Sequence, residues 1–386
     1  MRLDESPDQQ TLRNELRAYF AELLTDDVRE ELRVAGESAE PFRTLVRRMG
    51  ADGWLGIGWP KEYGGQGRPP SDQYVFFDEV QRAGAPFPFV TLNTVGPTIM
   101  LYGTEAQKAA YLPGILRGEV NFAIGYTESE AGTDLASLRT KAVRDGDEYV
   151  VDGAKVFTSG ANQADHVWLA CRTDADAPKH RGISIIIVPT TAPGFSWTPI
   201  ETVGGVVTTA TFYDDVRVPT GNRVGPENEG WRMITTQLNH ERVGLAAYSG
   251  LATRLMEEVR GLASTHGLLD EEWVRLDLAQ VHARMQAMRL LNWRMAQRMT
   301  EGTLSPADSS AVKVFGTEGL IEVYRLLLGI VGPVGSVRAG SASAVLAGDL
   351  ERAMRAAQIN TFGGGVNEVQ REIVAAVGLG MARQSR

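Results

Sequence analysis

The spacing of apolar residues first predicts helices. From residue 11 to about residue 118, apolar side chains recur three or four positions apart, as they do on one face of a helix. Two such stripes consist of Leu12, Leu16, Phe20 and Leu23, and of Phe42, Leu45, Val46 and Met49. The run Thr104-Glu105-Ala106-Gln107 has the form of a capping box, in which side chains satisfy the free amides at a helix start. Residues 53–70 are rich in Gly and Pro and predict a loop.

The pattern then changes to that of strands. From residue 121 to about 226, short apolar runs are divided by Gly, Asp, Asn and Pro, which is typical of a small β-domain. The runs lie at 149–151, 166–169, 183–188 and 208–212.

Helical spacing returns after Gly230. We expect helices at about 231–262 and 274–301, and a third that Ser305-Pro306 opens as cap and first-turn proline. Residues 263–273 between them are predicted to form a mobile loop. The pattern predicts an α+β protein of three domains: helical residues 1–120, a small β-barrel or sandwich at 121–228, and a helical bundle at 229–386.

Composition narrows the class of protein. A chain of 386 residues with 43% hydrophobic content can bury a large core. A net charge of −9 without a Lys/Arg run argues against nucleic acid or an anionic membrane as a partner. Cys171 is the single cysteine and the 5 histidines are scattered, so no disulfide and no metal site is expected. With no secretory signal and no bilayer-spanning stretch, we expect a cytoplasmic protein.

Glu241 lies on an apolar helical stripe. The other members of the stripe are Ile234, Leu238, Leu245, Tyr248, Ala252 and Leu255. Burial disfavours the charged form of a carboxyl group and raises its pKa, which suits proton transfer near neutral pH. Two other interpretations stay open at this point: a surface Glu, or one that forms a structural pair with Arg242 or another cation.

Two segments of the predicted β-domain are rich in hydroxyl groups. They are residues 126–134, Y-T-E-S-E-A-G-T-D, and residues 155–160, K-V-F-T-S-G. Hydroxyls, free loop amides and a nearby aromatic ring suit a planar cofactor that carries phosphate groups. The alternative is a pair of ordinary turns beside a core Phe. Phosphate-loop, serine-hydrolase and zinc-protease motifs are missing from the sequence, and its glycine clusters do not match a dinucleotide-binding fold.

With these segments, the chain resembles the acyl-CoA dehydrogenase family. The segment T-E-x-x-A-G-[ST]-D, an aromatic-x-[ST] segment after a Lys, an E-R pair on a long helix and a terminal G-x-N-E-x-Q-R-E-I-V stretch occur in the family's order. The resemblance covers essentially the whole length. It is closest to the actinobacterial branch that shortens steroid side chains, in which unequal subunits assemble. It implies an N-terminal helical domain, a β-domain and a C-terminal four-helix bundle.

The resemblance also implies a site for FAD. Its residues are Tyr126, Thr127, Gly132, Thr133, Phe157 and Ser159. Thr127 looks like the family's threonine at the pyrimidine edge of the flavin, and Thr133 like its donor to the pyrophosphate. Ser159 stands where a hydroxyl approaches N5, and Phe157 where the family often has Trp. In the family the flavin accepts a hydride from the substrate β carbon.

The catalytic base departs from the commonest family pattern. Many members carry it as Glu at the position that Gly364 occupies here. A minority carry it on the long helix as an E-R pair, which Glu241-Arg242 matches, so the resemblance implies that Glu241 removes the α proton. Arg242, Gly364 and Gly365 are then expected at the substrate, with an amide of the glycine loop bonding the thioester oxygen.

A second departure concerns assembly. Homotetrameric relatives complete the FAD site of a neighbour with an Arg after the long helix and a Gln before a Gly-Gly loop. Here residues 263–267 lack the Arg, and Gly329 stands near the Gln position. We therefore expect a hetero-oligomer with a sister subunit, with two copies of each.

The expected activity is FAD-dependent α,β-dehydrogenation of an acyl-CoA thioester, with a steroid side-chain ester as substrate. Electrons would pass to an electron-transfer flavoprotein. Three alternatives stay open: a non-catalytic partner subunit, a flavin oxidase or monooxygenase on the same fold, and a binding protein.

Overall fold

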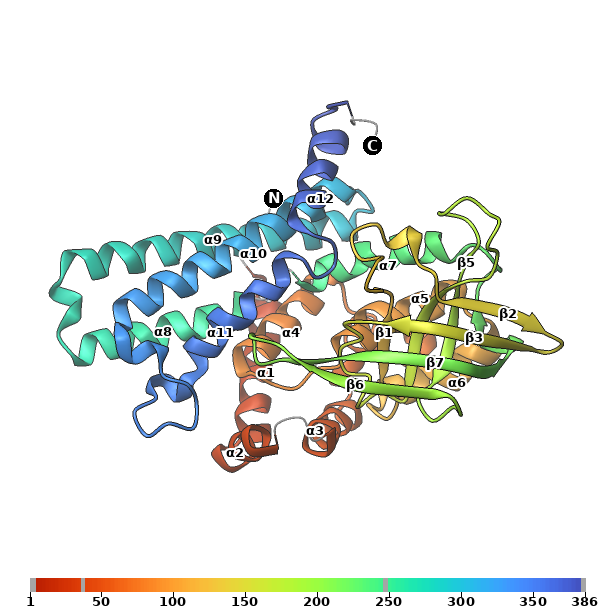
Figure 1. Ribbon diagram of the computed structural model, residues 1–386. Coiled ribbons are helices and arrows are strands. Elements are labelled where there is room, and N and C mark those ends of the chain that lie inside the picture. The colour runs from red at the N-terminus through yellow and green to blue at the C-terminus, as the bar shows by residue number, and fades with distance from the viewer. Residues whose placement is uncertain (1–4, 36–38, 246–248, 383–386) are drawn as a thin grey trace.

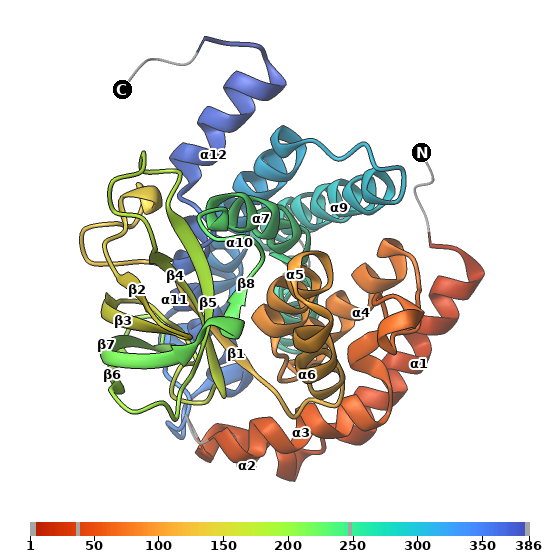
Figure 2. The same cartoon turned by 90° about the vertical axis from the view of Figure 1, so that its right-hand side faces the viewer.

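A computed structural model describes residues 5–35, 39–245 and 249–382 of the chain. It consists of N-terminal helices, a central sheet and C-terminal helices (Figure 1), in the predicted order. Figure 2 shows the sheet on one side of the molecule and the N-terminal helices on the other. None of the helices in the described ranges has the length and apolar character needed to cross a bilayer.

The N-terminal helices lie in the region where the sequence predicts helices. Their bounds are α1 Pro7–Leu23, α2 Asp26–Ala35, α3 Ala39–Ala51, α4 Pro70–Ala83, α5 Gly96–Tyr102 and α6 Glu105–Leu116. Thr104 forms the predicted capping box, since its hydroxyl accepts a hydrogen bond from the Gln107 amide at 3.2 Å. The predicted loop at 53–70 contains two 3₁₀ turns, Trp54–Gly56 and Lys61–Tyr63. A π-helical turn at Thr91–Val95 precedes α5.

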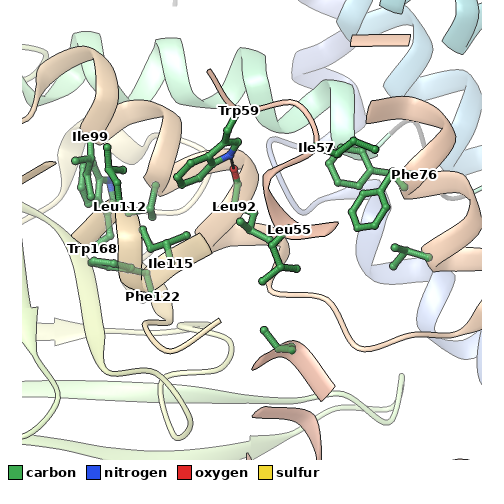
Figure 3. Packing of buried hydrophobic residues seen from close by; sticks show 14 of the residues in the cluster. Leu55, Ile57, Trp59, Phe76, Leu92, Ile99, Leu112, Ile115, Phe122 and Trp168 are labelled. Atoms are coloured by element: carbon green, nitrogen blue, oxygen red, sulfur yellow. Dashed lines mark hydrogen bonds between the residues drawn. The ribbon is translucent and has the colours of Figure 1, made fainter. Parts of the chain in front are cut away.

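The core of this region continues into the sheet. Figure 3 shows Trp59, whose Nε1 donates to the Leu92 carbonyl at 3.1 Å, in the same cluster as Phe122 and Trp168. Phe122 begins the first strand and Trp168 lies in the fourth. Because one apolar cluster joins helices and strands, these strands are fixed against the N-terminal helices.

The central residues form one sheet of 8 strands. Their bounds are β1 Phe122–Gly125, β2 Lys141–Asp145, β3 Glu148–Lys155, β4 His166–Arg172, β5 Ile183–Pro189, β6 Phe195–Glu201, β7 Val207–Pro219 and β8 Arg223–Val224. The order is β6-β7-β3-β2-β4-β5-β8, with β1 parallel to β4. Thus β3 lies directly beside β7, and the loop after β3 meets the start of β7.

The C-terminal helices enclose a second apolar core. Their bounds are α7 Gly230–Leu245, α8 Ser249–Thr265, α9 Glu272–Thr300, α10 Pro306–Val331, α11 Asp349–Ala357 and α12 Asn367–Ile373. Helices α8, α9, α10 and α11 supply the buried residues of this core. Helix α12 projects from the body of the molecule in both views (Figures 1 and 2).

Where the spacing predicts one helix, the residues on both sides of 246–248 are helical, and 246–248 lie outside the described residues. One boundary differs from the prediction. The predicted loop at 263–273 is shorter than expected, since α8 continues to Thr265 and α9 begins at Glu272. Ala263 is buried in the C-terminal core, and this packing extends the helix beyond what the local pattern indicates.

Candidate functional site

The structure brings the two hydroxyl-rich segments together. The amide of Val156 donates to the carbonyl of Thr127 at 2.8 Å. Beside it, Lys155 Nζ donates to the Tyr126 carbonyl at 3.0 Å and to Glu128 Oε1 at 2.8 Å. The loop that follows β1 and the loop that follows β3 therefore form one surface.

A buried ion pair holds this surface in place. The side chains of Lys155 and Glu128 are 0% and 10% exposed. Glu128 also accepts hydrogen bonds from the amides of Arg139 and Thr140, at 2.7 and 2.8 Å. Burial would raise the pKa of Glu128, but the charge of Lys155 and these hydrogen bonds outweigh it and lower that pKa. Glu128 is thus an ionised anchor for the loop.

Phe157 occupies an unusual position in the second loop. Its backbone has a φ of 60°, in the left-handed region that a bulky residue rarely adopts, and 60% of its side chain is exposed. Buried threonines hold the next residue: the Thr158 amide donates to the Thr209 carbonyl at 3.0 Å, and Thr209 Oγ1 donates to the Thr158 carbonyl at 2.6 Å. Thr158 Oγ1 also lies 3.2 Å from Thr211 Oγ1. This clamp on β7 keeps the Phe157 ring outside the core, with its face available.

The other predicted cofactor residues divide into exposed and buried groups. Gly132, Thr133 and Ser159 are exposed, and Ser159 Oγ lies 2.8 Å from Thr208 Oγ1. Tyr126 is buried, where its hydroxyl donates to Gln237 Oε1 and accepts from Trp168 Nε1 at 3.1 Å. The side chain of Tyr126 is therefore anchored between β4 and α7.

These exposed groups fit FAD. Phe157 offers an apolar face for a planar ring, and Thr133 and Ser159 offer hydroxyls for polar atoms. The space beside Gly132 is open, because an added Cβ would meet only Thr127 Cγ2, at 3.8 Å. These hydroxyl groups, the exposed ring and the open space beside Gly132 match the FAD that the sequence predicts.

The glycine loop lies at the start of α12. Gly364 and Gly365 have φ values of 66° and 94°, which favour glycine. A Cβ at Gly365 would lie 2.6 Å from Gln370 Nε2, so the end of that side chain would have to move. No hydrogen bond among the described residues joins this loop to the two β-domain segments.

The predicted base lies on α7. Glu241 and Arg242 fall within Gly230–Leu245, but their side chains lie outside the part that the structure describes. On the predicted stripe, Ile234, Ala252 and Leu255 are fully buried, as expected. Residues 263–267 lack the Arg that homotetrameric relatives carry, and residues 264–267 are exposed. Gly329 on α10, near the position of the relatives' Gln, is also exposed.

Sequence reasoning missed the residues that hold the site from behind. These are Glu128 with Lys155, the threonines of β7, and Lys313 under the glycine loop. A signal existed for two of them: Lys155 interrupts a β-pattern, and Lys313 stands between two valines in an apolar helix. A lysine at a core position predicts a buried partner, although not which one.

Comparison with known proteins identifies a family. Three models match: Acyl-CoA dehydrogenase, N-terminal domain, over residues 6–119; middle domain, over 123–216; and C-terminal domain, over 228–379. FadE26 and FadE29, acyl-CoA dehydrogenases of Mycobacterium tuberculosis, are 52% and 49% identical, each over the whole of both chains.

Solved structures agree over the full length. The Tcur3481-Tcur3483 steroid ACAD has a chain that is 61% identical with a TM-score of 0.96, covering 100% of both chains. A chain of the ChsE4-ChsE5 complex from Mycobacterium tuberculosis is 53% identical with a TM-score of 0.94, again covering 100% of both.

Proposed function

Because this chain belongs to the acyl-CoA dehydrogenase family, we propose that it is the catalytic subunit of an FAD-dependent complex that desaturates a steroid side-chain CoA thioester. The observation that carries the proposal is that Phe157, Ser159 and Thr133 are exposed on one surface. The buried ion pair of Lys155 and Glu128 stabilises the loops of this surface. We also propose the division into domains at 1–120, 121–228 and 229–386.

Members of the family use FAD, which when bound supplies the acceptor for the β hydride. In this chain, Thr127 and Thr133 would hold the pyrimidine edge and the pyrophosphate, with Gly132 leaving room for close approach. Ser159 would meet the reactive edge of the ring, and Phe157 would cover its face. Tyr126 would support the first loop from the interior, through Gln237 and Trp168.

Glu241 would remove the α proton of the thioester. The position of the commonest family base is Gly364, which has no side chain to accept a proton. Arg242 beside the base would favour an anionic substrate group, and a backbone amide at Gly364 or Gly365 would donate to the thioester oxygen. Stabilising negative charge at that oxygen makes the α proton easier to remove.

The substrate and partners follow from the relatives. One chain of a steroid ACAD and one chain of the ChsE4-ChsE5 complex are each more than half identical to this chain. We propose a steroid ester with a shortened side chain as substrate, and a sister subunit, in two copies of each, as partner. An electron-transfer flavoprotein would take the electrons, and the compartment would be the cytoplasm.

Replacement of the base tests the proposal. Glu241→Gln keeps the shape of the side chain but cannot accept a proton, so turnover of a steroid acyl-CoA should fall about 10²–10⁴-fold. Flavin absorbance and the unfolding midpoint should match those of the parent complex. A variant that kept more than a tenth of the parent turnover would exclude Glu241 as the base and favour a non-catalytic role for this subunit.

A further inference from the structure

A buried lysine lies beneath the glycine loop. Lys313, on α10, is 4% exposed. Its Nζ donates to the carbonyl of Thr361 at 3.1 Å, to the carbonyl of Gly365 at 2.8 Å and to Asn367 Oδ1 at 2.7 Å. An ammonium group has three N–H donors, and this segment offers three acceptors to it. The segment from Thr361 to Asn367 therefore curves around one cation.

Lys313 and Gln370 together set the direction of two loop amides. The described peptide bonds are trans, so each carbonyl points opposite to the N–H of the next residue. The Gly365 carbonyl points to Lys313, which turns the amide of Val366 away from α10. The Gly364 carbonyl faces Gln370 Nε2 at 3.4 Å, which turns the Gly365 amide away from α12.

These amides are not used within the described chain. No described acceptor bonds the N–H of Gly364, Gly365 or Val366, although their carbonyls and neighbours are bonded. Gly365 is exposed, so its amide is open to a ligand. Amides that are oriented in advance and left free are the groups that stabilise a developing oxyanion.

We propose that Lys313 is a positioning residue for the dehydrogenation: by binding the carbonyls of Thr361 and Gly365, it holds the loop between them in the conformation that presents the Gly364 and Gly365 amides to the thioester oxygen of the substrate. The proposal rests on the proposed function, because it needs an acyl-CoA in the site. Lys313 is buried and bonds the loop from beneath, so it would act on the substrate indirectly. Its action passes through the peptide groups, whose orientation it fixes.

The test compares Lys313→Met with Thr317→Val in the flavin-loaded complex. Methionine has a similar length and is uncharged, so the Thr361 and Gly365 carbonyls lose their donor. Thr317 Oγ1 accepts from Asn367 Nδ2 at 3.1 Å, so its loss disturbs the same contact between α10 and α12 without touching those carbonyls. Thermal unfolding and flavin absorbance would establish that both variants fold and load equally.

Two readouts separate positioning from stability. With a steroid acyl-CoA, Lys313→Met should lower kcat by roughly tenfold to a hundredfold with little change in KM, and Thr317→Val by less than threefold. With cinnamoyl-CoA labelled with ¹³C at the thioester carbonyl, the infrared carbonyl band should shift to lower frequency in the parent complex. In Lys313→Met, but not in Thr317→Val, it should return toward its position in water.

The outcomes distinguish this inference from the proposed function. An unshifted band in the parent complex, or equal shifts and equal kcat in the two variants, would overturn the role of Lys313. A parent complex that desaturates no steroid acyl-CoA would overturn the proposed function instead. A parent complex that is active, and is silenced by Glu241→Gln but not by Lys313→Met, would leave the function standing and remove the positioning role.

Discussion

At the scale of single residues, the site consists of exposed groups that can meet a ligand and buried groups that hold them. Lys155 and Thr158 are buried, whereas Phe157 and Ser159 between and beside them are exposed. The loop after β3 therefore turns Phe157 and Ser159 outward while Lys155 and Thr158 stay inside. Substitution of an exposed residue should mainly affect FAD binding, whereas substitution of a buried residue should mainly affect the free energy of unfolding.

Thr133 belongs to the exposed group. Thr133→Val replaces the hydroxyl by a methyl of similar shape, so FAD retention should fall while the free energy of unfolding of the flavin-free protein changes by less than about 0.5 kcal/mol. The measurement is flavin content after dialysis of the complex. Ser129→Ala, an exposed change in the same loop, is the control. Equal FAD content in Thr133→Val and the parent would remove Thr133 from the site.

Lys155 belongs to the buried group. Lys155→Met leaves the Glu128 carboxylate without its cation, which should lower the free energy of unfolding by roughly 3 kcal/mol. Urea unfolding at fixed protein concentration measures this loss. The control is Lys141→Met, which removes an exposed lysine 3.5 Å from Asp152 and should cost less than about 1 kcal/mol. Similar losses in the two variants would contradict the role of the buried pair.

The same pair has a defined pH dependence. The pKa of Glu128 is lower in the folded protein than in the unfolded chain, so its contribution to stability is complete above the unfolded value of about 4.3. The contribution is lost as the pH falls through the folded value. The difference in stability between the parent and Lys155→Met should therefore shrink as the pH falls below about 4.3.

At the scale of elements, close approach of helices depends on particular glycines. Gly250, in the first turn of α8, faces the backbone of α4: a Cβ there would lie 2.0 Å from the Asp78 carbonyl oxygen and 2.7 Å from the Arg82 amide. Backbone atoms cannot move aside as a flexible side chain can. The two helices therefore depend on this glycine for their separation.

Two glycines of α8 should respond oppositely to the same change. Gly250→Ala should destabilise the protein by about 3 kcal/mol, because α4 and α8 must separate. Gly261→Ala should stabilise it by about 0.5–1 kcal/mol, because a Cβ there meets nothing within 4 Å and alanine favours a helix. Urea unfolding of both variants measures the difference. A neutral Gly250→Ala would show that the α4–α8 contact adjusts freely.

At the scale of the whole molecule, the exposed position of Gly329 and residues 264–267 is consistent with a surface that a second subunit completes. In a homo-oligomer, both copies of the chain would lack the Arg and the Gln that complete the FAD site of a neighbour. Each charge-assisted hydrogen bond missing from a cofactor phosphate lowers affinity by on the order of 1.5–3 kcal/mol.

We therefore expect this chain alone to hold FAD poorly and to desaturate slowly or not at all. Co-expression with a sequence-related sister subunit that carries the missing Arg and Gln should restore both properties. Flavin absorbance and mass measurement of the two preparations test this. A fully flavin-loaded, active homotetramer would contradict the hetero-oligomer while leaving Glu241 as the proposed base.

The sequence by itself determined the elements and singled out the two hydroxyl-rich segments. Their signals are local: apolar spacing selects helix or strand, and caps such as Thr104 and Ser305 satisfy amides three residues away. Residues 126–134 and 155–160 were recognisable because hydroxyls and glycines stand close together in the sequence. Helix ends were less accurate, since α8 extends to Thr265 through packing that its local pattern does not encode.

Only the tertiary structure decided which polar groups meet. Lys155 bonds Glu128 across 27 positions, and Lys313 bonds Asn367 across 54. Neither partner was predicted, because a buried charge requires an acceptor but its identity depends on how the strands and helices pack. The direction of the glycine-loop amides also depends on packing. Glycine permits the positive φ values of the turn, and Lys313 on α10 fixes the peptide group between Gly365 and Val366 by binding its carbonyl.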